Sequence, residues 1–90
     1  MSSDLKSNYE FMTSAEISKS VALKIKKIRK KRFKTQELFA KHIGMSFGKY
    51  ARFEKSGQIS FQGFIDIIQG LDRVEEIVVA FNEDKEVIEW

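Results

Sequence analysis

The stretch TQELFAKHIGMSFGKYARFEKSG, residues 35–57, decides how this chain folds. Two short apolar patterns stand on either side of one glycine, Gly44. Thr35 and Ser46 each precede one pattern, and their short hydroxyl side chains can accept a hydrogen bond from the free amides of a first helical turn. Gly44 stands where the first helix would stop, because a left-handed residue there costs glycine nothing. The stretch predicts two short helices joined by a tight turn.

The apolar spacing indicates which side chains these two helices bury. Phe39, Ala40 and Ile43 share one face of the first helix, and Tyr50 and Phe53 share one face of the second. Ala40 is small, which fits a second helix that crosses close to the first.

The segment before this stretch predicts a longer helix. Residues up to about Thr13 have weak periodicity and are expected to form an arm. Ser14 is a plausible N-cap. The apolar residues after it recur every three or four positions on one face: Ile17, Val21, Ile25 and Ile28.

Two more helices are expected after the loop KSGQIS, residues 55–60. Ser60 is expected to cap a fourth helix and Asp72 a fifth. The fourth would turn these apolar residues inward: Phe61, Phe64, Ile65, Ile68 and Leu71. The fifth carries a stripe at i, i+3, i+4 and i+7, made of Val74, Ile77, Val78 and Phe81.

The expected fold is therefore all-α, a compact five-helix bundle around the central pair of short helices. Proline is absent and the glycines fall between periodic segments, which favours helices throughout. We expect an N-terminal arm at residues 1–13, one domain at 14–82, and a tail at 83–90 that could be a short strand or disordered. With 90 residues, a single domain is expected.

The net charge of +3 hides a strong asymmetry. Residues 19–55 contain 13 Lys or Arg and two acids, whereas residues 56–90 contain two Lys or Arg and eight acids. A chain with one basic half is suited to present that surface to a polyanion, whose phosphates would supply salt-dependent affinity. The alternative is a merely solvated helix face, since charge runs are often surface.

Other classes of function find little support in the composition. There is no cysteine, no apparent secretion signal and no apolar run of the ~20 residues that a membrane span needs. A cytoplasmic protein is expected. His42 is the single histidine, and no catalytic triad spacing, metal-ligand cluster or phosphate loop is apparent. We expect neither an enzyme nor a cofactor.

The central stretch resembles the phage-repressor and Cro-like (XRE-type) helix-turn-helix family. The family spacing is a Gln at the start of one helix, an apolar residue and Ala three and four positions on, and Gly at eight: Gln36, Phe39, Ala40 and Gly44 here. A Ser then opens the recognition helix, and Arg, an apolar residue and Glu close it: Ser46, Arg52, Phe53 and Glu54. The resemblance extends over roughly residues 17–81 and implies a lambda-repressor-like fold.

The resemblance also implies how the chain would bind double-stranded DNA. The second short helix would enter the major groove. The implied DNA-binding residues are Thr35, Gln36, Ser46, Phe47, Gly48, Lys49, Arg52 and Lys55. Arg52 could read guanine with two hydrogen bonds or contact a phosphate, and Gln36 could reach a phosphate or simply cap its helix. Phe47 could press on a thymine methyl group or fold onto the core, and Gly48 could allow close approach.

The family pairs an Arg in its first helix with the Glu that ends the recognition helix, here Arg29 and Glu54. We expect a partly buried ion pair that fixes one helix against the other; the alternative is two surface residues. This chain departs from the family at Lys34, where an apolar residue is usual, and at Phe33, where Gly is frequent. Phe33 could fill the missing core volume.

Two functions follow as expectations. The first is a transcriptional regulator that is expected to act as a repressor and to read a palindromic operator as a homodimer. The stripe of the last helix would lie either in the core or in the dimer seam. The second is an antitoxin that binds a HipA-like kinase toxin. The layout of the chain and its final Trp90 resemble those of such antitoxins. Ile77, Val78, Phe81 and Trp90 are then candidate dimer or toxin contacts, and Trp90 could equally pack on its own domain.

Overall fold

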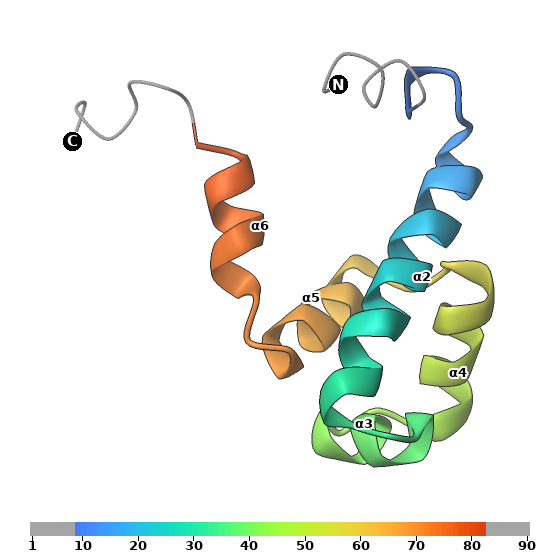
Figure 1. Cartoon of the computed structure of the whole chain (residues 1–90), viewed down its shortest axis with the longest axis vertical. Helices are drawn as coiled ribbons and strands as arrows, with labels where there is room; N and C mark the ends of the chain where they lie inside the picture. Colours follow the sequence, from blue (N-terminus) through green and yellow to red (C-terminus); the bar gives the residue numbers. More distant parts are fainter. Residues whose placement is uncertain (1–8, 83–90) are drawn as a thin grey trace.

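The computed structural model describes residues 9–82, and five helices lie wholly within this range (Figure 1). They are α2 (Ser14–Arg32), α3 (Gln36–His42), α4 (Phe47–Ser56), α5 (Phe61–Gly70) and α6 (Val74–Ala80). No strand occurs between residues 9 and 82. The expected all-α fold is confirmed. Within the same residues, no helix combines the length and apolar character needed to cross a bilayer.

The core lies where α2, α3, α4 and α5 meet. Tyr50 and Phe39 are fully buried, and their rings meet edge-on with centroids 5.0 Å apart. Phe33, in the loop after α2, adds a second edge-on contact to Phe39 at 5.2 Å and so fills volume beside the core, as expected. The core is completed by Ala22, Ile25, Ala40, Phe53, Ile67, Ile68 and Leu71.

Local side-chain chemistry fixes where most helices begin. The hydroxyl groups of Thr35, Ser46 and Ser60 accept hydrogen bonds from amides three residues ahead, at 3.0–3.2 Å, which confirms these three caps. The prediction for Ser14 is wrong by one residue. Thr13 is the N-cap, and it forms a capping box because its amide donates to the Glu16 side chain while its hydroxyl accepts from the Glu16 amide.

The prediction that Asp72 caps the last helix is also wrong. Asp72 has a φ of 60°, in the left-handed region, and closes the turn after α5. Its carboxylate accepts a hydrogen bond of 3.0 Å from Arg32 of α2 instead of an amide of α6. Arg73 takes the N-cap position without a side-chain hydrogen bond. The helix α6 thus starts without the side-chain cap that the other helices have.

The apolar residues of α6 face solvent more than the pattern suggested. Figure 1 shows α6 leaving α5 and running apart from the N-terminal half of α2. Within the stripe, Ile77 packs against the core, whereas Val78 and Phe81 are exposed. The part of the stripe beyond Ile77 is therefore not core.

The prediction that Phe61 faces inward is wrong, because Phe61 is 77% exposed at the start of α5.

Candidate nucleic-acid interface

The turn between α3 and α4 sets the angle between them. Gly44 has a φ of 69°, so the left-handed exit expected there is confirmed. The Met45 amide donates to the carbonyl of Ala40 at 2.9 Å, and the Gly44 amide donates to that of Lys41 at 3.2 Å. These bonds satisfy two carbonyls in the last turn of α3 and leave one residue, Ser46, before α4 begins.

A buried ion pair holds α4 against α2. Arg29 Nε and Nη2 donate to the two carboxylate oxygens of Glu54 at 3.0 and 3.1 Å. The two side chains are only 3% and 2% exposed, so the expected pair is present and more buried than expected. Both oxygens are used in a two-bond geometry, which gives orientation as well as attraction.

Two further side chains complete this network, and neither was predicted in that role. Gln36 Nε2 donates to Glu54 Oε1 at 2.7 Å, and the Tyr50 hydroxyl donates to Glu54 Oε2. Arg29 Nη1 also donates to the backbone carbonyls of Phe33 and Lys34, at 3.0 and 3.1 Å. The network therefore ties together α2, the loop after it, the first residue of α3 and the end of α4.

The network keeps Glu54 ionised. Burial acts to raise the pKa of this carboxyl, but hydrogen bonds from Arg29, Tyr50 and Gln36 outweigh it and hold the pKa below its ordinary value. The hydrogen bond to Glu54 raises the pKa of the Arg29 guanidinium. Burial, with the neighbouring carboxylate, raises the pKa of the Tyr50 phenol, so its hydroxyl stays a donor.

The opposite side of α4 is open. Gly48, Arg52 and Lys55 succeed one another at i, i+4 and i+7 and are all exposed. Lys49 is exposed beside them, and Phe47, the first residue of α4, is 50% exposed. Phe47 has not folded into the core, and it borders a shallow groove between α3 and α4. The structure thus gathers most of the sequence-predicted DNA-binding residues on one helix surface.

The remaining sequence-predicted residues lie at the starts of the two short helices. Thr35 and Ser46 are exposed and already serve as caps. Gln36 is half-buried, with its side-chain nitrogen held by Glu54. Its side chain is thus a structural partner of the ion pair, a role that depends on how α3 crosses α4 and that no sequence spacing indicates.

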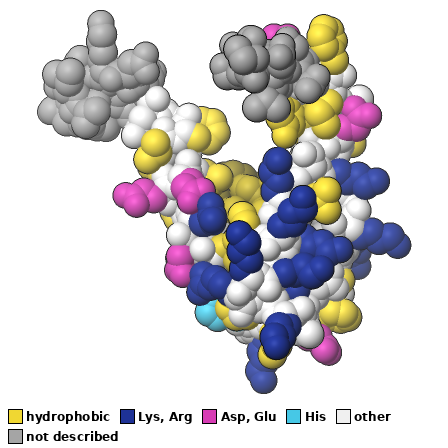
Figure 2. Space-filling model, in the orientation of Figure 1, with side chains coloured by type: hydrophobic (Ala, Val, Ile, Leu, Met, Phe, Trp, Pro, Cys, Tyr) yellow, Lys and Arg dark blue, Asp and Glu magenta, His cyan; other side chains and the backbone are white. Residues whose placement is uncertain are grey.

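Charge is distributed unevenly over the surface. Figure 2 shows Lys and Arg side chains gathered over α2 and its neighbours, while Asp and Glu side chains lie mainly along α6. The ion pair between Arg32 and Asp72 lies where the basic and acidic parts meet. On the face that Figure 2 shows, the charge asymmetry of the sequence is therefore also an asymmetry in space.

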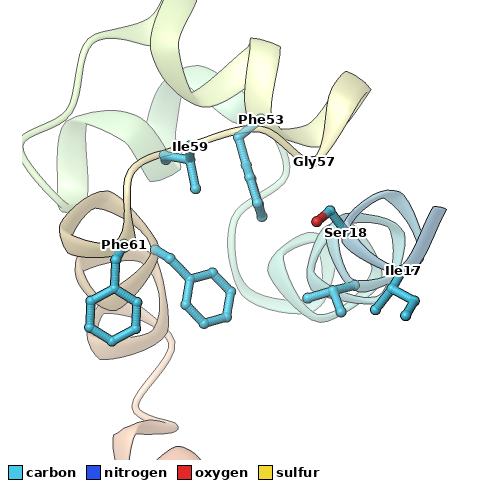
Figure 3. A pocket seen from close by; sticks show the side chains of 8 residues that line it. Ile17, Ser18, Phe53, Gly57, Ile59 and Phe61 are labelled. Atoms are coloured by element: carbon cyan, nitrogen blue, oxygen red, sulfur yellow. The ribbon is translucent and has the colours of Figure 1, made fainter. Parts of the chain in front are cut away.

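An apolar groove opens between the N-terminal half of α2 and the start of α5. Figure 3 shows Ile59 and Phe53 directed into it, and Ile17 of α2 lines its other side. Val21, Phe61 and Phe64 line it as well.

Among the candidate dimer or toxin contacts, Ile77 is half-buried and Val78 and Phe81 are exposed. Trp90 lies outside the described residues.

Comparison with known proteins adds no relative. No family model matches the chain, and neither the curated proteins nor the solved structures searched contain a match. What the site can do therefore rests on its own geometry.

Proposed function

We propose that this chain is a sequence-specific regulator of transcription that binds double-stranded DNA as a homodimer, with α3, the turn and α4 acting as a helix-turn-helix. The observation that carries the proposal is the contrast between the two sides of α4. One side is fixed to α2 and α3 by a buried, fully bonded ion pair, and the other presents exposed Arg52, Lys49 and Lys55. A rigidly mounted cationic helix is what base reading in the major groove requires.

Each group then has a defined role toward DNA. Arg52, in the middle of the open side, is placed to read a base edge, and guanine offers two acceptors for its fork. Lys49 and Lys55 flank it and suit phosphates. The exposed starts of α3 and α4, at Thr35 and Ser46, point backbone amides outward, which also favours phosphate. The Gln36 side chain supports this arrangement by holding Glu54.

A selection experiment tests the proposal. The purified chain is incubated with a pool of random-sequence duplexes, and bound DNA is recovered and sequenced. We expect enrichment of two similar half-sites in inverted orientation, centred about 10 base pairs or ~34 Å apart. For the enriched duplex, the logarithm of the association constant should fall linearly with that of salt, by about 0.9 per phosphate contacted. A pool that enriches no sequence would refute the proposal.

The same proposal assigns a seam to the homodimer. The stripe on α6 leaves Val78 and Phe81 exposed, next to half-buried Ile77. Apolar surface of this kind on a small domain is suited to burial against a second protein. A two-fold axis beside α6 would let each stripe meet its copy, because the same patch faces itself in such an interface.

Replacing Val78 by aspartate should convert the dimer to a monomer. A charge in an apolar seam would lose its water without gaining a partner. Val79→Asp is the matched control, because Val79 is 57% exposed and Val78 56%, but Val79 lies outside the stripe. Sedimentation equilibrium gives the mass of each species, and Val79→Asp should stay dimeric. A wild-type chain that is monomeric at every concentration would contradict the homodimer. The stripe would then be a candidate contact for another partner, such as the toxin of the antitoxin alternative.

A further inference from the structure

Gly48 lies on the open side of α4, in the first turn of the helix, and nothing in residues 9–82 requires glycine there. Its φ is not in the left-handed region, and a Cβ built on it meets no atom within 4 Å. Neither the backbone conformation nor packing against the described part of the chain therefore requires glycine at this position. Glycine within a helix is less favourable than alanine, because the free chain loses more conformational entropy on folding.

The other four glycines of the chain each have such a reason. Gly44 and Gly57 have positive φ. A Cβ on Gly57 would also lie 2.5 Å from backbone of Ser18, one on Gly63 2.8 Å from Ile59, and one on Gly70 2.3 Å from Ile43. A Cβ on Gly44 would also meet open space, but its positive φ requires glycine there. Gly48 alone has neither a positive φ nor a close neighbour among residues 9–82, so the reason for its missing side chain would lie in a binding partner.

The residues around Gly48 indicate what fits there. Phe47 precedes it with half of its surface exposed, and Arg52 stands one turn later with its charged group free to reach outward. The missing side chain leaves an opening in the exposed helix surface, called the notch below, and Phe47 and Arg52 are its neighbours along α4. The notch has the size of a missing methyl group and carries no polar side chain of its own.

Resting on the proposed DNA binding, we infer that this notch receives the C5-methyl group of one thymine in each half-site. The thymine methyl is the one apolar group that base pairs present in the major groove, and apolar contact distinguishes it from cytosine. Phe47 and the Arg52 stem would cover the methyl group while the Arg52 guanidinium reads a neighbouring base. Gly48 is then a specificity-determining residue that acts through the absence of a side chain.

The inference predicts effects of opposite sign for Gly48→Ala. Folding stability should increase, because the new methyl group has free space and alanine favours the helix; we expect Tm to rise by about 2–5 °C. DNA affinity should decrease, because the new methyl group occupies the place of the thymine methyl. A glycine without a binding role would give the first effect and not the second.

The decisive experiment uses the duplex enriched from the random pool, with deoxyuridine placed at one thymine at a time. This exchange removes only the methyl group. Wild-type protein should lose affinity about fourfold at one position per half-site, the value of one buried methyl-sized group. Gly48→Ala should bind the thymine and uracil duplexes equally. Lys49→Ala, the control, should weaken both duplexes alike and keep the fourfold ratio.

The outcomes separate the two proposals. An enriched duplex in which every thymine can be replaced at no cost, or a Gly48→Ala protein with wild-type preference for thymine, overturns the methyl inference and leaves DNA binding standing. A wild-type protein that enriches no sequence overturns both. A stabilised Gly48→Ala protein that has lost the thymine preference supports the inference.

Discussion

Replacing Glu54 by alanine should lower the free energy of unfolding by about 3–5 kcal/mol, the cost of breaking a buried ion pair from one side. The variant would leave the Arg29 guanidinium buried with only its two carbonyl partners, and the Tyr50 hydroxyl and Gln36 amide without theirs. Because small domains have only about 5–15 kcal/mol of stability, the variant should unfold at much lower urea concentrations than the wild-type protein. Circular dichroism at 222 nm follows the transition.

The control is an ion pair of the same chemistry at the surface. Arg73 and Glu76 also lie 3.0 Å apart, but the Glu76 side chain is 65% exposed. Glu76→Ala should change the free energy of unfolding by less than about 1 kcal/mol, because water screens the pair. Similar losses for Glu54→Ala and Glu76→Ala would show that the burial of the pair between Arg29 and Glu54 adds nothing to the free energy of unfolding. Should Glu54→Ala fail to fold, Glu54→Gln keeps the volume and gives a smaller loss of the same sign.

Acid should reveal the same network in the unmodified protein. The folded-state pKa of Glu54 lies below its ordinary value of 4.5, so the unfolded chain takes up a proton first as the pH falls. The stabilisation is therefore fully present above about pH 4.5 and is lost as the pH falls through the lowered folded pKa. Glu54→Gln, which does not titrate, should lose less stability than the wild-type protein over this window.

Local chemistry explains why so much of the fold could be predicted from the sequence. Thr35, Ser46 and Ser60 mark helix starts because a cap is made with amides only three residues away. The wrong choice of Ser14 over Thr13 was avoidable, since Glu16 stands three residues after Thr13 and completes a capping box. Helix starts of this kind depend on neighbours in the chain and need no knowledge of the tertiary structure.

Features set by distant segments could not be predicted in the same way. Asp72 carries a good capping side chain, but its carboxylate pairs with Arg32, 40 residues away, and its backbone closes the turn. The contact from Gln36 to Glu54 depends on how α3 crosses α4, and no spacing along the chain shows it. The contact from Tyr50 to Glu54 was within reach, because residues four apart meet on one helix face.

The candidate DNA-binding residues lie between these two cases. The side of α4 that faces outward follows from the burial of Tyr50 and Phe53, which the apolar spacing already indicated. The exposure of Phe47 and the open space at Gly48 required the three-dimensional structure. Sequence periodicity can thus say which side of a helix is free, whereas shape on that side depends on the packing around it.

Replacing Arg52 by alanine should weaken binding to the duplex enriched from the random pool by about 10–100-fold, the value of a two-bond contact between arginine and guanine. The same variant should bind a scrambled duplex of equal composition nearly as well as the wild-type protein does. A base contact contributes only to the matched sequence, whereas phosphate contacts contribute to every sequence. Fluorescence anisotropy on both duplexes at one salt concentration measures the two affinities.

Two control variants separate geometry from charge. Arg52→Lys keeps the positive charge but has no planar fork, so it should lose most of the discrimination and keep the salt dependence. Arg73→Ala removes the same charge from the N-cap of the acidic helix α6 and should leave both affinities close to wild type. An equal loss on the enriched and scrambled duplexes for Arg52→Ala would identify Arg52 as a phosphate contact, and base reading would then have to come from the rest of the open side of α4.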